Sequence, residues 1–308
     1  MTTETHVTTE TAALITGATR RRRGRRRPDG SVRPPRPRPL AHLMLIGFGV
    51  LMLYPLIWML GASFKESEFI FSEVSPFPNP ATLENYRQGW QGSGVGFGTY
   101  FLNSTIVSGL SVVGNMFACS LAGFAFARME FRGRKFFFAA MLATLMLPTH
   151  VLLVPQYILF SQLGWVNSFL PLVVPKFLAV DAFFIFLMVQ FLRGLPRELD
   201  QAAMIDGAGP WQTYWRIILP LTLPALATTA IFTFIWTWND FLTPLLYLQD
   251  PRMYTVPLGL NAFLDASGES AWGPMFAMAV LSLGPLFGFF LAGQKYLTSG
   301  IATTGLKG

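Results

Sequence analysis

The apolar residues of this chain come in long unbroken blocks rather than at the spacing of an amphipathic helix. Such blocks can cross a hydrocarbon core of about 30 Å, whereas membrane β-strands would show alternating segments of about ten residues. We therefore expect an all-α membrane protein with six transmembrane helices, at about residues 41–62, 100–126, 136–160, 169–193, 217–248 and 272–298.

The fifth of these segments is too long for one straight crossing. Pro220 and Pro224 lie near its start, and Pro244 lies near its end. Proline removes a backbone donor and clashes with the preceding turn, so helices bend or stop near it. We therefore predict kinks or points of re-entry at these three positions.

Composition agrees with a membrane protein, and no constellation of residues supports an enzyme. Of the 308 residues, 52% are hydrophobic and 13% charged, against about 25% charged in soluble domains. The sequence contains no GxxxxGK[ST] phosphate loop, no GxSxG and no HExxH, and its three histidines are far apart. We expect no enzyme activity, no metal site and no cofactor in this chain. The single cysteine, Cys119, excludes a disulfide within the chain.

The placement of Lys and Arg predicts the orientation in the membrane. With the N-terminus inside, 19 of the 23 Lys and Arg fall in inside segments. The exceptions are Lys65, Arg87, Lys176 and Arg252. Both termini and the segment 194–216 should therefore face the cytoplasm. Residues 63–99 and 249–271 would lie outside, as simple connections or as docking surfaces for an external partner.

Residues 1–39 form a separate segment that is rich in Arg and Pro and cannot bury a core. We expect it to be disordered, with residues 40–308 forming the membrane domain. The run TRRRRGRRRPDGSVRPPRPRP is open to three interpretations: a topology determinant, a site for anionic lipid headgroups, or a nucleic-acid contact. We expect a lipid membrane, and no nucleic acid, among the partners.

Charged residues inside the predicted spans are few: Lys176, Asp181 and Asp240. Such residues are functional candidates by default, but we favour a structural polar contact between helices for each of them. On a continuous helix Lys176 and Asp181 would lie about 140° apart and so not on one face. A carrier driven by an ion gradient would usually show more charges and a repeat of its broken helices.

The most specific stretch is DQAAMIDGAG, residues 200–209, between two long apolar blocks. Residues 197–205 can form about two helical turns, with Glu198 and Asp200 in the positive first turn. Gly207 can supply the left-handed backbone that closes a helix, and Pro210 can open the next one. We predict a short helix, a sharp turn, and a second helix that runs directly into the fifth span.

Two interpretations of this short helix remain open on physical grounds. Ala202 and Ala203 are small enough to let another surface approach closely, and Met204 and Ile205 offer apolar contact. A helix joined rigidly to a span can transmit movement from such a partner. The same residues would also suit an amphipathic helix that rests on lipid headgroups.

The stretch ELDQAAMIDGAGPWQTYWRIILPLTLPAL resembles the EAA loop of ABC-importer permeases, in which Glu-Ala-Ala is followed by Gly and then by Ile-x-Leu-Pro. Further stretches resemble the maltose-type permeases for carbohydrate uptake over roughly residues 40–308, among them YFLNSTIVSG, LAGFAFARMEFRGRKFFF, MLPTHVLLVPQYILFSQLGWVNS, WNDFLTPLLYL and GQKYLTSGIATTGLKG. The resemblance implies the type I importer fold in the bacterial cytoplasmic membrane.

The resemblance also implies a set of partners and a role for the loop. Residues 197–208 would be a coupling helix seated on a cytoplasmic ATPase dimer, which binds the ATP and Mg that this chain does not. The residues implied in that contact are Glu198, Asp200, Gln201, Ala202, Ala203, Asp206, Gly207 and Ala208. An extracytoplasmic binding protein would deliver the sugar, and a second, similar permease would complete the pore.

One position departs from the family pattern, because Gln201 stands where the triplet has Glu. A glutamate there would give an ionic contact to the ATPase, which glutamine cannot provide. Glu198 or Asp200 could supply the missing charge.

Aromatic faces and planar polar groups hold sugars, and the fifth span offers both in Trp236, Trp238, Asn239 and Asp240. Together with Asp181 they are the candidates for a substrate path, although tryptophan is also common at membrane interfaces. The leading hypothesis is thus a permease subunit of an ABC sugar importer. The alternatives are a stand-alone ion-coupled carrier and a membrane scaffold that acts through its Arg-rich segment.

Overall fold

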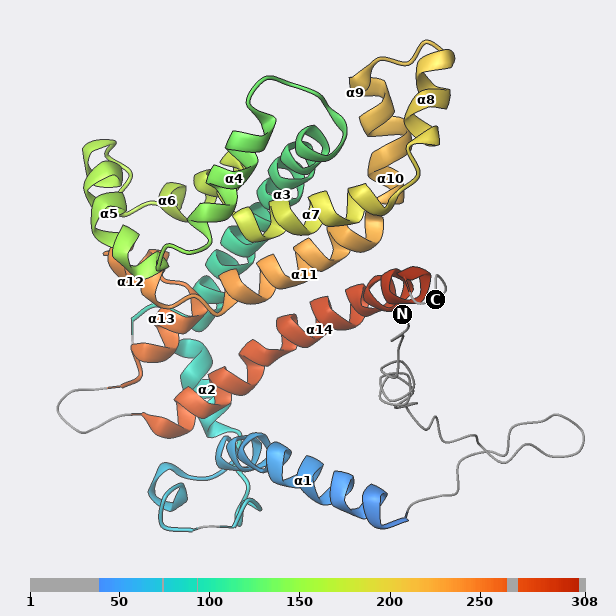
Figure 1. Ribbon diagram of the computed structural model, residues 1–308. Helices are drawn as coiled ribbons and strands as arrows, with labels where there is room; N and C mark the ends of the chain where they lie inside the picture. Colours follow the sequence, from blue (N-terminus) through green and yellow to red (C-terminus); the bar gives the residue numbers. More distant parts are fainter. Residues whose placement is uncertain (1–38, 74, 93, 265–270, 305–308) are drawn as a thin grey trace, which may run out of the picture. The chain divides into compact units, whose positions relative to one another are not determined.

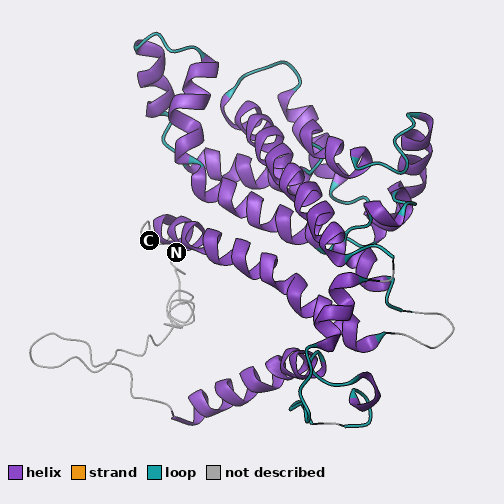
Figure 2. Ribbon diagram, turned by 180° about the vertical axis from the view of Figure 1, so that it is seen from behind, coloured by secondary structure: helices purple, strands orange, loops and turns teal. Residues whose placement is uncertain are grey.

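The computed structural model describes residues 39–73, 75–92, 94–264 and 271–304 of the chain. The expectation of disorder for residues 1–39 lies almost entirely outside them. Contacts divide the chain into two units, residues 1–54 and 55–308, and the second contains the packing and the sites of interest. All regular elements in the described residues are helices, and Figure 2 shows them joined by loops.

The elements up to residue 162 are α1 (Pro39–Ala62), η1 (Ser67–Phe69), α2 (Glu84–Gln91), α3 (Phe97–Arg128), α4 (Arg134–Thr144), η2 (Thr149–Leu152) and α5 (Leu153–Gln162). The next are α6 (Leu170–Val173), η3 (Val174–Leu178), α7 (Ala182–Gly194), α8 (Glu198–Ile205), α9 (Pro210–Thr213), the π-helical turn η4 (Tyr214–Ile218) and α10 (Leu219–Leu221). The last are α11 (Leu223–Trp238), α12 (Leu242–Tyr247), η5 (Pro251–Met253), α13 (Val256–Asn261) and α14 (Trp272–Thr304).

Four of the described helical segments are long and apolar enough to cross a membrane by themselves: Pro39–Ala62, Phe97–Arg128, Leu170–Gly194 and Trp272–Tyr296. A fifth candidate is the bent pair Pro210–Leu221 and Leu223–Trp238. The remaining predicted span, 136–160, is not one helix, since α4 ends at Thr144 and α5 begins at Leu153. Pro148 lies in the gap, where it disfavours helical backbone in the residue before it.

The bend in the fifth predicted span confirms the role expected for its prolines. Its two helical parts meet at 75°, and Thr222 lies between them. The Thr222 hydroxyl donates to the carbonyl of Leu219 at 2.8 Å, and the Thr222 N–H donates to the same carbonyl at 3.1 Å. Near the other end, α11 stops at Trp238 and Pro244 lies in the separate helix α12.

α3 is the central helix of the second unit and packs against both α7 and α11, while α14 packs on α11 (Figure 1). The close approach of α3 to α7 requires glycine at position 123, because a Cβ there would lie 2.6 Å from the Cβ of Met188. Helices in membranes associate through small residues and interhelical hydrogen bonds. One such bond joins Asn115 Nδ2 to Thr233 Oγ1 at 2.8 Å between α3 and α11.

Candidate functional site

The stretch between α7 and α9 contains the predicted short helix. α8 begins at Glu198 and ends at Ile205, with Arg197 as its N-cap. Glu198 and Asp200 lie in its first turn, as the sequence indicated. Carboxylates are stabilised there by the positive end of the helix dipole.

Gly207 closes α8 in the left-handed conformation predicted for it, with φ +78°. Its N–H donates to the carbonyl of Met204 at 3.1 Å, and the N–H of Ala208 donates to the carbonyl of Ala203 at 2.8 Å. This pair of bonds is a Schellman motif, which satisfies the last carbonyls of a helix and fixes the direction in which the chain leaves it. α8 is therefore held at a defined angle to α9.

Pro210 is the first residue of α9, also as predicted, and the N–H of Gly209 before it donates to Gln212 Oε1 at 3.3 Å. α9 continues through η4 and α10 to the bend at Thr222. Tyr214 in η4 is buried, and its hydroxyl lies 2.7 Å from that of Ser120 on α3. The second helix is thus fastened to the central helix.

The residues of the loop differ in exposure, and the two alanines have different surroundings. Ala203 is only 3% exposed and is covered by this chain itself, whereas its neighbour Ala202 is exposed. Met204 is 66% and Ile205 is 86% exposed, so both large apolar side chains are accessible at the surface of the loop. The other exposed residues of segment 197–208 are Arg197, Glu198, Gln201, Asp206 and Gly207, while Asp200 and Ala208 are half-buried.

A residue that the sequence did not single out, Arg128 at the end of α3, holds this loop in place. Its guanidinium forms an ion pair with the Asp200 carboxylate, and its Nη2 donates to the carbonyls of Leu192 and Leu195 at 2.7 and 2.9 Å. The Arg128 side chain is 4% exposed. Because Asp200 is engaged within the chain, Glu198 is the better placed of the two acids to offer a charge to a partner.

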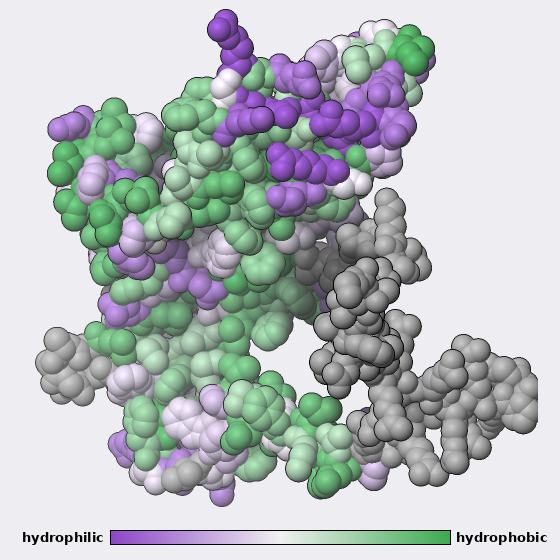
Figure 3. Space-filling model, in the orientation of Figure 1, coloured by the Kyte–Doolittle hydropathy of each residue, from purple (hydrophilic) through white to green (hydrophobic). Residues whose placement is uncertain are grey.

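A cavity of about 320 Å³ lies beside this ion pair, between the end of α3 and the loop. Its lining consists of Phe124, Arg128, Met129, Glu130, Asp200, Met204, Ala208, Pro210 and Thr213. Figure 3 shows hydrophilic side chains gathered over the ends of α3 and α4 and around α8. In the described part of the chain, no group of His, Cys, Asp and Glu side chains could hold a metal ion.

Comparison with known proteins decides the family. A model described as "Binding-protein-dependent transport system inner membrane component" matches residues 114–302. The trehalose/maltose transport system permease protein MalG of Thermococcus litoralis is 36% identical over 270 residues, which cover 86% of this chain and 96% of that protein. The chain belongs to this permease family. It is therefore a multi-pass, inner-membrane component of a transport system rather than an enzyme.

Two further similarities agree with this assignment to the permease family. The arabinooligosaccharides transport system permease protein AraQ of Halalkalibacterium halodurans is 34% identical over 275 residues, covering 87% of this chain and 97% of that protein. Among solved structures, a bacterial ABC transporter involved in the import of the acidic polysaccharide alginate has a TM-score of 0.73, with 22% identity over 84% of this chain and 96% of that one. At that identity the structure shows a shared fold.

The candidates for a substrate path in this permease are only partly brought together. Trp236 is 52% exposed and packs against Phe183 and Phe184, two and three residues after Asp181, with ring centroids at 5.7 and 5.2 Å. Trp238 is 2% exposed, and its Nε1 donates to the carbonyl of Ser282 at 3.2 Å. Burial in the core between α11 and α14 thus makes Trp238 a structural residue.

Asn239 and Asp240 make local bonds at the end of α11. Asn239 Nδ2 donates to the carbonyl of Ile235 at 2.8 Å, and Asp240 Oδ1 accepts from the N–H of Thr243 at 3.1 Å. These contacts agree with the structural interpretation of both residues. A carboxylate can accept several hydrogen bonds, so Asp240 retains capacity for another donor.

The expectation that Lys176 and Asp181 point to different faces is wrong. Their Nζ and Oδ2 atoms form an ion pair at 2.8 Å, with side chains 28% and 26% exposed. The expectation assumed one continuous helix, but the helix breaks between them, since η3 ends at Leu178 and Ala179 has φ +55°. This break in the helix brings the two charged side chains into contact.

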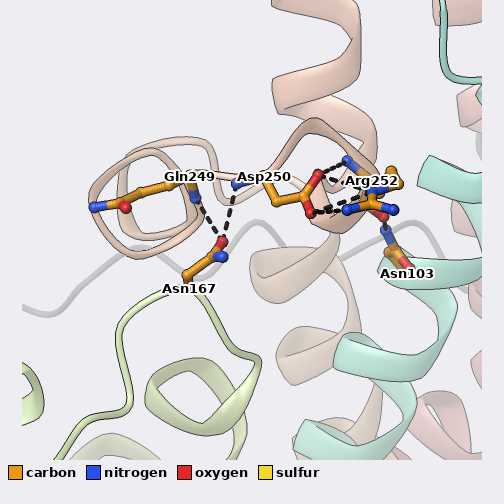
Figure 4. Close-up of polar contacts among 5 residues, drawn as sticks. All are labelled: Asn103, Asn167, Gln249, Asp250 and Arg252. Atoms are coloured by element: carbon orange, nitrogen blue, oxygen red, sulfur yellow. Dashed lines mark hydrogen bonds and ion pairs between the residues drawn. The ribbon is translucent and has the colours of Figure 1, made fainter.

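The end of α3 remote from Arg128 is also fixed by polar contacts (Figure 4). Asn103 Nδ2 donates to the carbonyls of Arg252 and Tyr254 at 2.9 and 3.0 Å. Asn167 Oδ1 accepts from the N–H groups of Gln249 and Asp250 at 3.0 and 2.9 Å. Hydrogen bonds from the Arg252 side chain hold the pKa of Asp250 below its usual value. Segment 249–254 is therefore tied both to α3 and to the loop around Asn167.

Proposed function

We propose that this permease is a subunit of an ATP-driven importer and that residues 197–208 couple it to a cytoplasmic ATPase dimer. The observation that carries the proposal is the geometry of α8. The Schellman turn at Gly207 fixes α8 against α9, and α9 continues into the bent span. Exposed Met204 and Ile205 offer an apolar surface to a partner, and the exposed acids Glu198 and Asp206 lie at the two ends of α8. A lipid-resting helix would not need such a rigid connection to a span.

The ATP and Mg belong to the ATPase subunits in this proposal. Their closure around ATP displaces α8, and the spans respond by changing from inward-open to outward-open. A second, similar permease lies beside this chain, and a binding protein on the other side of the membrane delivers the substrate. Membership in a binding-protein-dependent family supports these partners.

The topology in this proposal has six spans with both termini in the cytoplasm. The distribution of Lys and Arg supports the orientation. The pair α4 and α5 forms the third span, although neither helix is long enough alone, with 11 and 10 residues. Non-helical backbone at membrane depth is tolerated where protein surrounds it. In this proposal the second permease surrounds the gap between α4 and α5.

The substrate in this proposal is a sugar or an oligosaccharide. The names of the two relatives, for trehalose/maltose and for arabinooligosaccharides, support this class. Trp236 supplies an exposed aromatic face for a sugar ring and packs on the two phenylalanines that follow Asp181. Asn239 and Asp240 add polar groups at the end of α11.

The test is purification of the chain from native membranes in mild detergent, followed by mass spectrometry and reconstitution. We expect an ATPase with a Walker-A sequence and a second multi-span permease in fixed ratio, and uptake of a labelled oligosaccharide mixture that requires ATP. A chain that purifies alone and transports without ATP would show instead an ion-coupled carrier. Asp181 and Asp240 would then be the first residues to substitute.

A further inference from the structure

We propose that α3 is the rod that carries movement of α8 through the membrane to segment 249–254, and that Arg128 and Asn103 are the positioning residues that fasten its two ends. This inference rests on the proposed function, since it assumes that α8 is displaced by an ATPase. It gives a role in transport to Arg128 and Asn103, which lie far apart in space and contact neither ATP nor sugar.

The first requirement for such a rod is stiffness. α3 is one unbroken helix of 32 residues with no proline inside it, and at 1.5 Å per residue it is about 48 Å long. It also lies at the centre of the packing between α7 and α11. α3 thus lacks a proline, one of the main causes of sharp kinks in helices.

The second requirement is a firm attachment to α8, which Arg128 supplies. The planar guanidinium has its donors in a fixed fork, so a single side chain can hold several acceptors at set angles. Here it joins the Asp200 carboxylate on α8 to the carbonyls of Leu192 and Leu195 at the end of α7. The charges suit the helix ends, with the cation at the C-terminus of α7 and the anion in the first turn of α8.

The burial of Arg128 indicates that this attachment persists when α8 moves. The Arg128 side chain is 4% exposed, and breaking its ion pair would leave a mostly buried charge without its partner, which is strongly destabilising. The hydrogen bond between Ser120 and Tyr214 is a second link, about two helical turns away along α3, to the helix after the loop. Both links tie the loop to the central helix.

The third requirement is an attachment at the far end. Asn103 lies 25 residues before Arg128, about 38 Å away along the helix. Its amide donates to two carbonyls of the segment, and the hydroxyl of Ser104 accepts from the N–H of Val256 at 2.8 Å. These contacts involve backbone groups, so they fix the path of the segment whatever side chains it carries. Displacement of α3 must therefore displace segment 249–254.

The experiment uses the complete complex in lipid nanodiscs, with Mg and a non-hydrolysable ATP analogue as the probe. A polarity-sensitive fluorophore is attached to Arg252→Cys, whose side chain is 79% exposed in the native protein. A second sample carries the fluorophore at Ile205→Cys on α8. The buried native thiol is removed by Cys119→Ala in both samples.

We expect the analogue to change the emission at both positions in the otherwise native complex. Arg128→Gln should reduce the change at position 252, since the link between Ser120 and Tyr214 remains, and should leave the change at position 205. Asn103→Ala, which removes the contact at the opposite end of α3, should likewise lower the change at position 252 and leave the change at position 205. Asp200→Asn should have a smaller effect, since the asparagine side-chain oxygen can still accept a hydrogen bond from Arg128. Arg132→Gln, an exposed arginine four residues further on, is the matched control and should change neither signal.

A full response at position 252 in an intact Arg128→Gln complex would overturn the inference, as would a native complex that responds at position 205 alone. If Arg128→Gln fails to assemble, Asn103→Ala decides the matter, because its contacts lie at the opposite end of α3 from the ATPase. If the native complex contains no ATPase and responds at neither position, the proposed function fails instead, and the inference fails with it.

Discussion

The hydroxyl groups of Ser120 and Tyr214 lie 2.7 Å apart and join the central helix α3 to η4, the turn after the loop. Both residues are 2% exposed. Ser120→Ala and Tyr214→Phe should each lower the free energy of unfolding by about 0.6 to 1.7 kcal/mol, the range for interhelical hydrogen bonds in membranes. Unfolding in a detergent titration measures this loss. The double variant should cost little more than the worse single one, and fully additive losses would show that the two hydroxyls act independently.

A second prediction follows from the left-handed backbone at Gly207. Gly207→Pro should leave the chain in the membrane but abolish ATP-dependent uptake, because proline is fixed near φ −65° and cannot donate to Met204. Gly207→Asn is the matched control, since asparagine tolerates this conformation. Uptake in membrane vesicles is the measurement. Normal uptake by the proline variant would show that the orientation of α8 does not matter for transport.

The two alanines of the loop should respond differently to the same substitution. Ala203→Arg places a charge in a position that the chain itself covers, so the variant should be poorly folded and scarce in membranes. Ala202→Arg should fold and accumulate normally, because Ala202 is exposed, yet lose the co-purifying ATPase through steric hindrance. Quantitative immunoblots of permease and ATPase distinguish the two effects. Retention of the ATPase by Ala202→Arg would remove this residue from the proposed contact.

Because Lys176 and Asp181 form an ion pair, the effects of substituting them on thermal stability should not be additive. Lys176→Met or Asp181→Asn leaves one uncompensated charge within a predicted span, which is worse than removing both. The single variants should therefore melt at lower temperatures than the double variant. Thermal unfolding of the detergent-solubilised complex measures this order. A double variant that is the least stable of the three would show that the charges have separate partners.

The pattern of the sequence predicted those features that depend on near neighbours. The cap at Gly207, the start of α9 at Pro210 and the bend near Pro220 all follow from backbone chemistry within a few residues, and the structure contains each of them. The apolar blocks likewise predicted a helical membrane protein, because length and hydropathy are local properties.

The features that the sequence did not predict depend on residues far apart in the chain or on a break in a helix. Arg128 and Asp200 are 72 residues apart, and no local signal distinguishes Arg128 from the other arginines at the ends of the spans. Lys176 and Asp181 were assigned to different faces because their sequence contains no glycine to mark the left-handed residue, which is Ala179. The sequence made Trp238 a candidate for contact with a sugar, but the packing of α11 on α14 shows that it lies in the core.

Contact between α8 and an ATPase can be observed by placing a photo-crosslinking amino acid at Ile205, which is 86% exposed. Leu102, at the opposite end of α3 and 60% exposed, is the control position. Illumination of native membranes should join position 205, and not position 102, to a chain with a Walker-A sequence. Crosslinks from position 205 to lipid alone, with the ATPase present in the same membranes, would contradict the coupling role of this helix.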